Sequence, residues 1–214
     1  MKRTVRVVPA ILTDDPATLA TLVSRTDGFT DYAQIDIMDG RFVPPQSITA
    51  ADIGRLSFNF KWEAHLMVAQ PEACLEGFKE AGARRIVFHY EATDNPGEVI
   101  VQIKGLGLEA GLAVNPETPA SVITPLANEL DGVLFLSVNP GYYGSEFIPG
   151  VLDKIAAFRR DYPDMEIAID GGMKEDNIAL TARSGVDVIC VGSAIFRQPQ
   201  PGESYRRLLA LANE

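Results

Sequence analysis

Short apolar runs alternate with amphipathic stretches along the whole chain. A strand buried on both faces shows as a run of four to eight apolar or β-branched residues, whereas a surface helix repeats its apolar positions every three to four residues. The runs predict eight strands, at Val5–Leu12, Ala33–Met38, Lys61–Met67, Arg85–His89, Ala110–Val114, Gly132–Val138, Glu166–Asp170 and Val186–Val191. The amphipathic stretches predict helices between them, among others at Pro71–Ala83, Pro96–Leu106, Pro149–Tyr162, Lys174–Ser184 and Ser204–Asn213.

The boundaries of these stretches carry the residues expected there. Pro71 and Pro149 suit a first helical turn, and Gly107 and Gly185 suit helix ends. The segment Pro44–Phe60 has neither pattern, and we expect a long loop with a short helix there. Strands that alternate with helices eight times are typical of a TIM (β/α)8 barrel rather than of an open doubly wound sheet. We expect one α/β domain that spans residues 1–214.

Three polar side chains follow apolar runs at the predicted carboxyl ends of strands. They are Asp36 in AQIDIMDG, His65 in WEAHLMV and Asp170 in IAIDGGM. Each one alone could simply cap the helix that follows its strand. Together they favour a shared site, because the carboxyl ends of parallel strands open onto one rim and His65 is one of only two histidines. Acid/base groups or metal ligands are therefore expected on that rim.

Glycine-rich loops follow the last three predicted strands. Backbone N–H groups in such loops, next to a helix N-terminus, can hold a phosphate dianion. A glycine pair alone predicts only a turn, so the prediction depends on three loops that converge. The residues concerned are Gly141, Tyr142, Tyr143, Gly144, Gly171, Gly172, Gly192 and Ser193.

Composition narrows the class of partner. A net charge of −10 argues against binding to nucleic acid, which needs a concentrated basic face, so an anionic substrate would have to be held by local donors. Cys74 and Cys190 have no metal-binding spacing, and we expect buried free thiols in a reducing cytoplasm. The first residues lack a convincing cleavage site, and no apolar run reaches the roughly 18 residues that span a membrane. We expect a cytoplasmic protein.

A series of motifs resembles the ribulose-phosphate 3-epimerase family nearly from end to end. They are VPAIL, DIMDGRFVP, AHLMV, FHYEA, AGLAVNPETP, LSVNPGYYGSEFIP, IDGGMKEDNI and VGSAIF. The resemblance implies a TIM barrel and a bound divalent metal ion, with Zn, Mn, Fe, Co and Mg all open. It also implies inversion of carbon 3 of a sugar phosphate, from ribulose 5-phosphate to xylulose 5-phosphate or in a related ketose phosphate. Family members are commonly homo-oligomers.

Inversion next to a carbonyl removes a proton from one face and returns one to the other face, through an enediolate, so two acid/base groups are needed. The resemblance places them at Asp36 and Asp170, which it also makes metal ligands together with His65. The cation would stabilise the developing negative charge. Met38 and Met67 match positions beside the intermediate, where they would keep water away. Without the motif, each would be an ordinary core methionine.

Departures from the family cluster in this site. Gln34 stands where the family has its first histidine ligand, and a neutral amide oxygen is a weaker donor than imidazole for a metal such as zinc. Ala10 replaces a serine, Leu136 replaces a methionine, and Tyr143 replaces a glycine close to the expected phosphate. The metal could therefore be held less tightly than in the family.

Two further hypotheses stay open. A decarboxylase or hexulose-phosphate aldolase would carry a lysine in an Asp-x-Lys-x-x-Asp array, whereas this chain reads Asp36-Ile37-Met38-Asp39. A non-catalytic paralogue would bind a sugar phosphate without converting it; Gln34 and Ala10 favour this, and the retained acids and His65 oppose it. His89 and Glu91 also match the family, and we expect them only to order the fourth strand and its loop.

Overall fold

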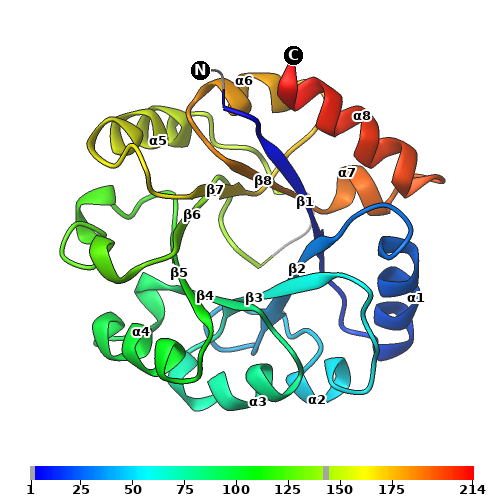
Figure 1. The fold of residues 1–214 in the computed structure, drawn as a ribbon, viewed down its shortest axis with the longest axis horizontal. Helices are drawn as coiled ribbons and strands as arrows, with labels where there is room; N and C mark the ends of the chain where they lie inside the picture. Colours follow the sequence, from blue (N-terminus) through cyan, green and yellow to red (C-terminus); the bar gives the residue numbers. More distant parts are fainter. Residues whose placement is uncertain (1–2, 142–144) are drawn as a thin grey trace.

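Eight parallel strands form a closed barrel in sequential order, with β8 paired to β1 (Figure 1). The computed structural model describes residues 3–141 and 145–214. The strands are β1 (Arg6–Ile11), β2 (Tyr32–Met38), β3 (Lys61–Met67), β4 (Arg85–His89), β5 (Glu109–Val114), β6 (Gly132–Leu136), β7 (Ile167–Asp170) and β8 (Val188–Val191). The predicted TIM barrel is confirmed, and each predicted strand is found within two residues of its expected ends.

Helices surround the barrel on its outer side (Figure 1). They are α1 (Pro16–Thr26), α2 (Ala50–Ile53), α3 (Leu75–Glu80), α4 (Pro96–Gly105), α5 (Gly150–Asp161), α6 (Ile178–Arg183), α7 (Ser193–Phe196) and α8 (Pro201–Asn213). Short 3-10 turns accompany them at η1 (Pro71–Ala73), η2 (Tyr90–Ala92), η3 (Ala120–Val122) and η4 (Ala127–Glu129). The helix α2 confirms the short helix expected within the long loop after β2, and the side chains of Thr49 and Asp52 form its capping box.

Three connections differ from the expected pattern. The connection between β5 and β6 holds only η3 and η4, because Pro119 and Pro125 interrupt it and a proline inside a helix removes a backbone donor. The helix expected at Pro71–Ala83 divides into η1 and α3. The helix expected from Lys174 begins only at Ile178, since the Asn177 side chain accepts a hydrogen bond from the Lys174 N–H and holds a turn there.

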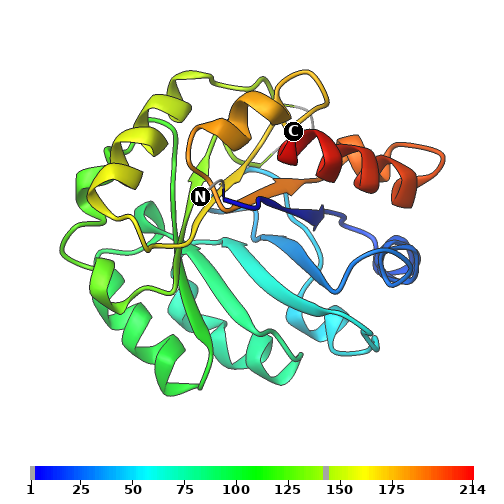
Figure 2. The same ribbon diagram turned by 45° about the horizontal axis from the view of Figure 1, so that its top comes forward.

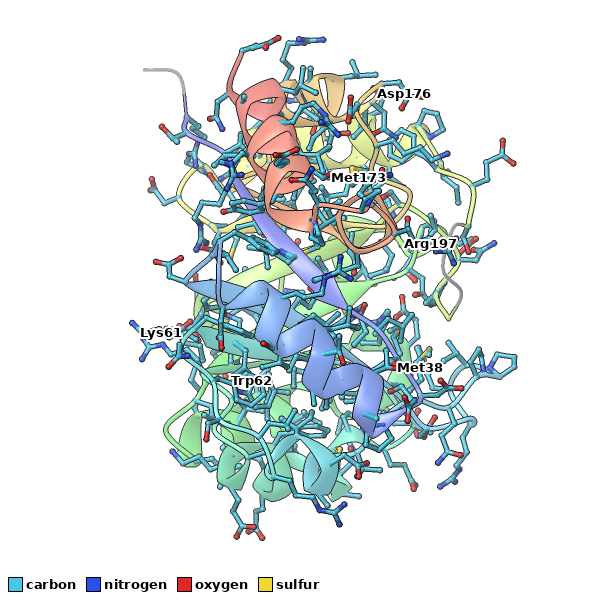
Figure 3. All side chains as sticks on the ribbon, turned by 90° about the vertical axis from the view of Figure 1, so that its right-hand side faces the viewer. Met38, Lys61, Trp62, Met173, Asp176 and Arg197 are labelled. Carbon is cyan, nitrogen blue, oxygen red and sulfur yellow. The ribbon has the colours of Figure 1, made fainter. Side chains whose placement is uncertain are left out.

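Side chains alternate between the barrel interior and the helix layer. Outward-facing residues such as Ile35, Ala64 and Phe88 are buried against the helices, as alternation along a strand requires. Inward-facing apolar residues fill the middle of the barrel: Val8, Ala10, Val87, Ala113, Leu134, Leu136, Val188 and Cys190. Polar side chains occupy both ends. In Figure 3, Met38 at the end of β2 lies on the opposite side of the barrel from Lys61 at the start of β3.

The two ends of the described chain meet at the outer wall. The helix α8 packs beside α6 and β1 (Figures 1 and 2). The Asn213 side chain accepts a hydrogen bond from the Val5 N–H at 3.0 Å and donates one to the Val5 carbonyl at 2.9 Å. These contacts fix the residue before β1 against the last turn of α8. Across the described ranges, no helix combines the length and the apolar character needed to cross a membrane.

Candidate active site

Strand register brings the predicted polar residues to one rim. Asp36 and His65 are direct neighbours in the pairing of β2 with β3, and Asp170 is the last residue of β7. All three face the same cavity at the carboxyl ends of the strands. The structure therefore places side chains from three separate segments within reach of one another.

The geometry of this group is close. His65 Nδ1 lies 2.9 Å from Asp36 Oδ1 and 3.7 Å from Asp170 Oδ2. One potential ligand atom from each of the three residues lies within 4.8 Å of the other two. Two carboxylate oxygens and an imidazole nitrogen are donors that borderline and hard divalent cations accept. The group has the composition and the spacing of a cation site.

Electrostatics in the cavity also fit a bound positive charge. Burial, and then the negative charge of Asp36, raise the pKa of Asp170 well above its ordinary value. Burial of His65 lowers its pKa, but the hydrogen bond with Asp36 and the charges of Asp36 and Asp170 outweigh it, so the net shift is upward. Two buried carboxylates so close together favour either a shared proton or a cation between them.

Gln34 lies beneath the carboxylates and joins them. Its amide nitrogen donates hydrogen bonds to Asp36 Oδ1 at 2.8 Å and to Asp170 Oδ2 at 2.7 Å. Its amide oxygen accepts a hydrogen bond from the Cys190 thiol at 3.2 Å. In this orientation the amide supplies partial positive charge to the acids and turns its potential ligand atom away. A rotation of the amide would bring the oxygen to the acids and leave the nitrogen to donate to the Cys190 sulfur.

Glycine-rich turns form the other side of the cavity. Its lining includes Gly141, Gly171, Gly172, Gly192 and Ser193, whereas Tyr142, Tyr143 and Gly144 lie outside the described residues. Among the described residues that line the cavity, Lys174 is the one lysine or arginine. Ser193 begins α7, and the first N–H groups of a helix have no partner within the helix. This side of the cavity therefore offers backbone donors and one cation.

The turn after β7 depends on its two glycines. Gly171 has φ +116°, and a Cβ atom there would lie 2.5 Å from Val138 Cγ2. Gly172 has φ +67°, and its Cβ would lie 3.0 Å from Phe147. Ser137 fixes the same turn, since its hydroxyl donates to the carbonyls of Asp170 at 2.9 Å and Gly171 at 2.7 Å. The backbone is thus held in a form that other residues cannot adopt without strain.

Apolar residues close the cavity around the acids. Met67, Ala10 and Leu136 line it, as does Met173, which the sequence motifs did not single out. Met38 is buried beside Met67 and Val43 but is not part of the cavity lining. Two of the positions that depart from the family, Ala10 and Leu136, therefore do face the site.

Several residues that shape the site were not predicted from the sequence. Ser47 donates to the Asp36 carbonyl at 3.1 Å and accepts from the Met38 N–H at 2.9 Å, which fixes the end of β2. Asp39 accepts hydrogen bonds from the N–H groups of Phe42 and Ala69 and so ties the loops after β2 and β3 together. No local pattern marks these roles, because the contacts form only when the loop after β2 folds back onto its strand and meets the loop after β3.

The two cysteines have different surroundings. Cys190 is buried in β8, as expected, whereas Cys74 is only half-buried, because it lies between η1 and α3 rather than inside a helix. Burial raises the pKa of the Cys74 thiol to about 11. Neither sulfur is among the grouped candidate metal ligands of the described residues.

Comparisons with known proteins identify the relatives of the chain. Residues 6–196 match the sequence model of the Ribulose-phosphate 3 epimerase family. Ribulose-phosphate 3-epimerase 2 of Cupriavidus necator is 38% identical over an aligned length of 220 residues, and the match covers 97% of this chain and 91% of that protein. The cytoplasmic isoform of ribulose-phosphate 3-epimerase from Oryza sativa subsp. japonica is 37% identical over an aligned length of 205 residues, and the match covers 92% of this chain and 90% of that protein.

Solved structures share the fold. The crystal structure of KGPDC from Streptococcus mutans has a TM-score of 0.77, with 12% identity, and the match covers 98% of each chain. The 3-hexulose-6-phosphate synthase from Salmonella typhimurium has a TM-score of 0.71, with 17% identity, over 97% of this chain and 98% of its own. At these identities the likeness concerns the barrel alone.

Proposed function

Because the chain belongs to the ribulose-phosphate 3-epimerase family of isomerases, we propose that it inverts carbon 3 of a ketose phosphate, with ribulose 5-phosphate and xylulose 5-phosphate as the pair. The observation that carries this proposal is the pair of carboxyl groups, Asp36 on β2 and Asp170 on β7, in one cavity. A single base could exchange the proton on one face of a carbon. Two groups from separate strands can serve both faces.

The electrostatics give the two acids different roles. The pKa of Asp170, raised by burial and by the charge of Asp36, suits this residue to hold the transferred proton on one carboxyl oxygen while the other oxygen stays available as a ligand. Asp36 then takes the carbon-3 proton from the opposite face, and Asp170 returns one to the enediolate. In the reverse direction the roles exchange. Two carboxyl groups that can exchange the roles of proton donor and proton acceptor suit a reaction that runs both ways.

We propose that Asp36, His65 and Asp170 hold a divalent cation, with Gln34 as a further oxygen ligand when its amide turns. The buried pair of acids and the close spacing of the three donor atoms support this. Such a cation supplies Lewis acidity that stabilises negative charge on the substrate oxygens. Zinc, manganese, iron, cobalt and magnesium all accept this donor set, so the ion is assigned only by class.

The glycine turns and Lys174 form the proposed phosphate side of the site. Gly171, Gly172 and Gly192 offer backbone N–H groups, and Lys174 adds a positive charge in a protein with a net charge of −10. Binding energy from the phosphate group would hold carbon 3 in a fixed orientation between the two acids. This positioning would speed the proton transfers.

A substrate panel tests the proposal. The purified protein is offered ribulose 5-phosphate, unphosphorylated ribulose and hexulose 6-phosphate, and products are identified by NMR. We expect xylulose 5-phosphate from the first and much slower conversion of the second. Release of formaldehyde from the hexulose phosphate would instead indicate an aldolase, and binding of all three without conversion would indicate the non-catalytic paralogue. The Asp170→Asn protein is the control, and activity equal to that of the natural protein would contradict the assignment.

A further inference from the structure

A second imidazole contacts His65 on the side away from the cavity. His89, the last residue of β4, places its Nε2 3.0 Å from His65 Nε2. Both histidines are fully buried, and their ring planes are inclined by only 24°. The other nitrogen of His65, Nδ1, faces Asp36 and Asp170. One nitrogen of His65 therefore faces the proposed cation site, and the other faces His89.

The hydrogen between the two rings is bonded to one specific histidine. Two ring nitrogens at 3.0 Å attract each other only if one of them carries a hydrogen and the other has a free lone pair. Turning either ring over would place a carbon atom at this contact and lose it. The surroundings of His89 determine which of the two histidines donates.

The second nitrogen of His89 has oxygen atoms as its neighbours. His89 Nδ1 lies 3.4 Å from Glu91 Oε2, and the Asn115 side chain is its other polar neighbour. His89 Nδ1 and Asn115 Oδ1 are both buried, and neither has a hydrogen-bond partner within standard distance and angle limits in the described part of the chain. A lone pair on Nδ1 would be repelled by these oxygens, whereas a hydrogen there is attracted. Neutral His89 thus carries its hydrogen on Nδ1 and has a bare Nε2.

Glu91 is itself fixed in place. It accepts a hydrogen bond from the Asn115 N–H at 2.8 Å and another from the Thr118 hydroxyl. Lys154 of α5 holds that same loop, with its Nζ 2.6 Å from the Pro116 carbonyl and 2.8 Å from the Thr118 carbonyl. A chain of contacts therefore runs from α5 through the loop after β5 to His89 and then to His65.

We propose that His89, oriented by Glu91, is a positioning residue that holds a hydrogen on His65 Nε2, so that Nδ1, which donates to Asp36 at 2.9 Å while no cation is bound, is the nitrogen that ligates a divalent cation in place of that hydrogen. This inference rests on the proposed function in one respect only, the presence of a divalent cation at Asp36, His65 and Asp170. Ligating histidines commonly donate their second N–H to an acceptor that fixes the tautomer, and loss of that acceptor typically weakens metal binding 10- to 100-fold. Here the acceptor is another imidazole rather than a carboxylate or carbonyl.

Nitrogen NMR reads the tautomers directly. The chain has only two histidines, so a protein labelled with 15N-histidine gives four ring nitrogens to assign. In the metal-free protein we expect a hydrogen on Nε2 of His65 and on Nδ1 of His89, with His89 Nε2 bare. A hydrogen on His89 Nε2 together with a bare His65 Nε2 would overturn the proposal. The outcome does not depend on whether the protein has epimerase activity.

A pair of substitutions then tests the consequence for metal binding. His89→Phe keeps a planar ring but removes the acceptor, whereas His89→Gln retains an amide that can accept from His65. The dissociation constant of Mn²⁺ alone is measured by calorimetry on the metal-free proteins. We expect weaker binding in His89→Phe, by about 10- to 100-fold, and recovery of most of the affinity in His89→Gln.

Phe88→Leu provides the matched control, because Phe88 lies next to His89 on β4 but faces the helix layer. It should lower the unfolding midpoint without changing Mn²⁺ affinity. Equal Mn²⁺ affinity in the natural protein and His89→Phe would overturn the positioning role. If His89→Phe does not fold, the tautomers of the natural protein and the affinity of His89→Gln still decide the question. Correct tautomers in a protein that binds Mn²⁺ but does not epimerise would contradict only the proposed function.

Discussion

Asp36 and Asp170 are the residues on which the proposed chemistry depends. We predict that Asp36→Asn and Asp170→Asn each lower kcat/KM for epimerisation by roughly 100- to 10,000-fold, because an amide keeps the shape of the carboxyl group but cannot exchange the proton. Circular dichroism should show an intact fold. Steady-state kinetics on ribulose 5-phosphate measure the loss. Near-normal turnover in either variant would remove that residue from the mechanism.

Gln34 is the departure from the family that touches both acids. We predict that Gln34→His raises the metal content of the purified protein, because imidazole ligates borderline cations better than an amide oxygen does. Elemental analysis of the protein as isolated measures the change, and added Mn²⁺ should raise activity more in the natural protein than in the variant. Identical metal content in both proteins would show that position 34 does not contribute a ligand.

The sequence identified the main polar residues of the site but not their supports. Asp36, His65 and Asp170 follow buried strands, and the geometry of parallel strands makes their meeting predictable. Ser137 and Ser47 act through contacts with strand ends and loops that only the folded chain provides. The contact of His89 with His65 was also missed, since His89 was expected only to order its own strand.

At the scale of elements, the strands were easier to predict than the helices. A strand buried on both faces leaves a continuous apolar run, whereas a short helix such as α6 leaves only a few periodic positions. The connection between β5 and β6 was predicted least well, because its order comes from Lys154 contacts that no local pattern encodes. The geometry of the site depends most on the turns, where only a narrow range of backbone dihedral angles fits.

The turn after β7 illustrates that demand. We predict that Gly171→Ala lowers the free energy of unfolding by about 1–3 kcal/mol and raises KM, because the position has φ +116° and the new Cβ would meet Val138. Gly150→Ala is the control, since nothing lies within 4 Å of that Cβ at the start of α5. Urea unfolding and substrate titration measure both effects. If the two alanine variants behave alike, the turn is not constrained as described.

The loop that Glu91 supports gives a pH-dependent prediction. Burial raises the pKa of Glu91, but the His89 imidazole beside it and the hydrogen bonds from the Thr118 hydroxyl and the Asn115 N–H outweigh this and bring the pKa to about 2. A carboxyl group whose pKa is lowered on folding stabilises the fold above its unfolded pKa and loses this contribution as pH falls through the folded value. The stability advantage of the natural protein over Glu91→Gln should thus be constant above about pH 5 and shrink towards pH 2. Urea unfolding at several pH values measures it, and a constant difference would contradict the assignment.

At the scale of the whole molecule, the two ends of the barrel differ. The carboxyl ends of the strands carry the proposed active site, and the amino ends, here called the structural end, carry a network of ion pairs. The structural end holds Arg85, whose guanidinium lies 2.5 Å from Glu166, 3.0 Å from Glu109 and 3.5 Å from Glu63. The Tyr32 hydroxyl donates a further hydrogen bond to Glu63 at 2.9 Å. This network fills the amino ends of the strands, and none of its residues lines the cavity that holds Asp36 and Asp170.

Loss of Arg85 should therefore affect stability and leave the chemistry alone. Its side chain is 14% exposed and that of Glu63 is 5% exposed, so Arg85→Met leaves a buried carboxylate without its partner. Breaking a buried ion pair costs about 3–5 kcal/mol. Lys104→Met, which breaks an exposed pair with Asp131, should cost no more than about 1 kcal/mol. Both variants should keep the natural KM while folded. A large change of KM in Arg85→Met would contradict the separation of the ion-pair network from the active site.

Exchange at carbon 3 tests the central claim most directly. Ribulose 5-phosphate is incubated with the purified protein in heavy water, and proton NMR follows the carbon-3 signal of substrate and product together. Two acids that remove a proton from one face and return one to the other predict xylulose 5-phosphate that carries deuterium at carbon 3. Product that keeps its original carbon-3 proton, or no exchange and no product, would contradict the account.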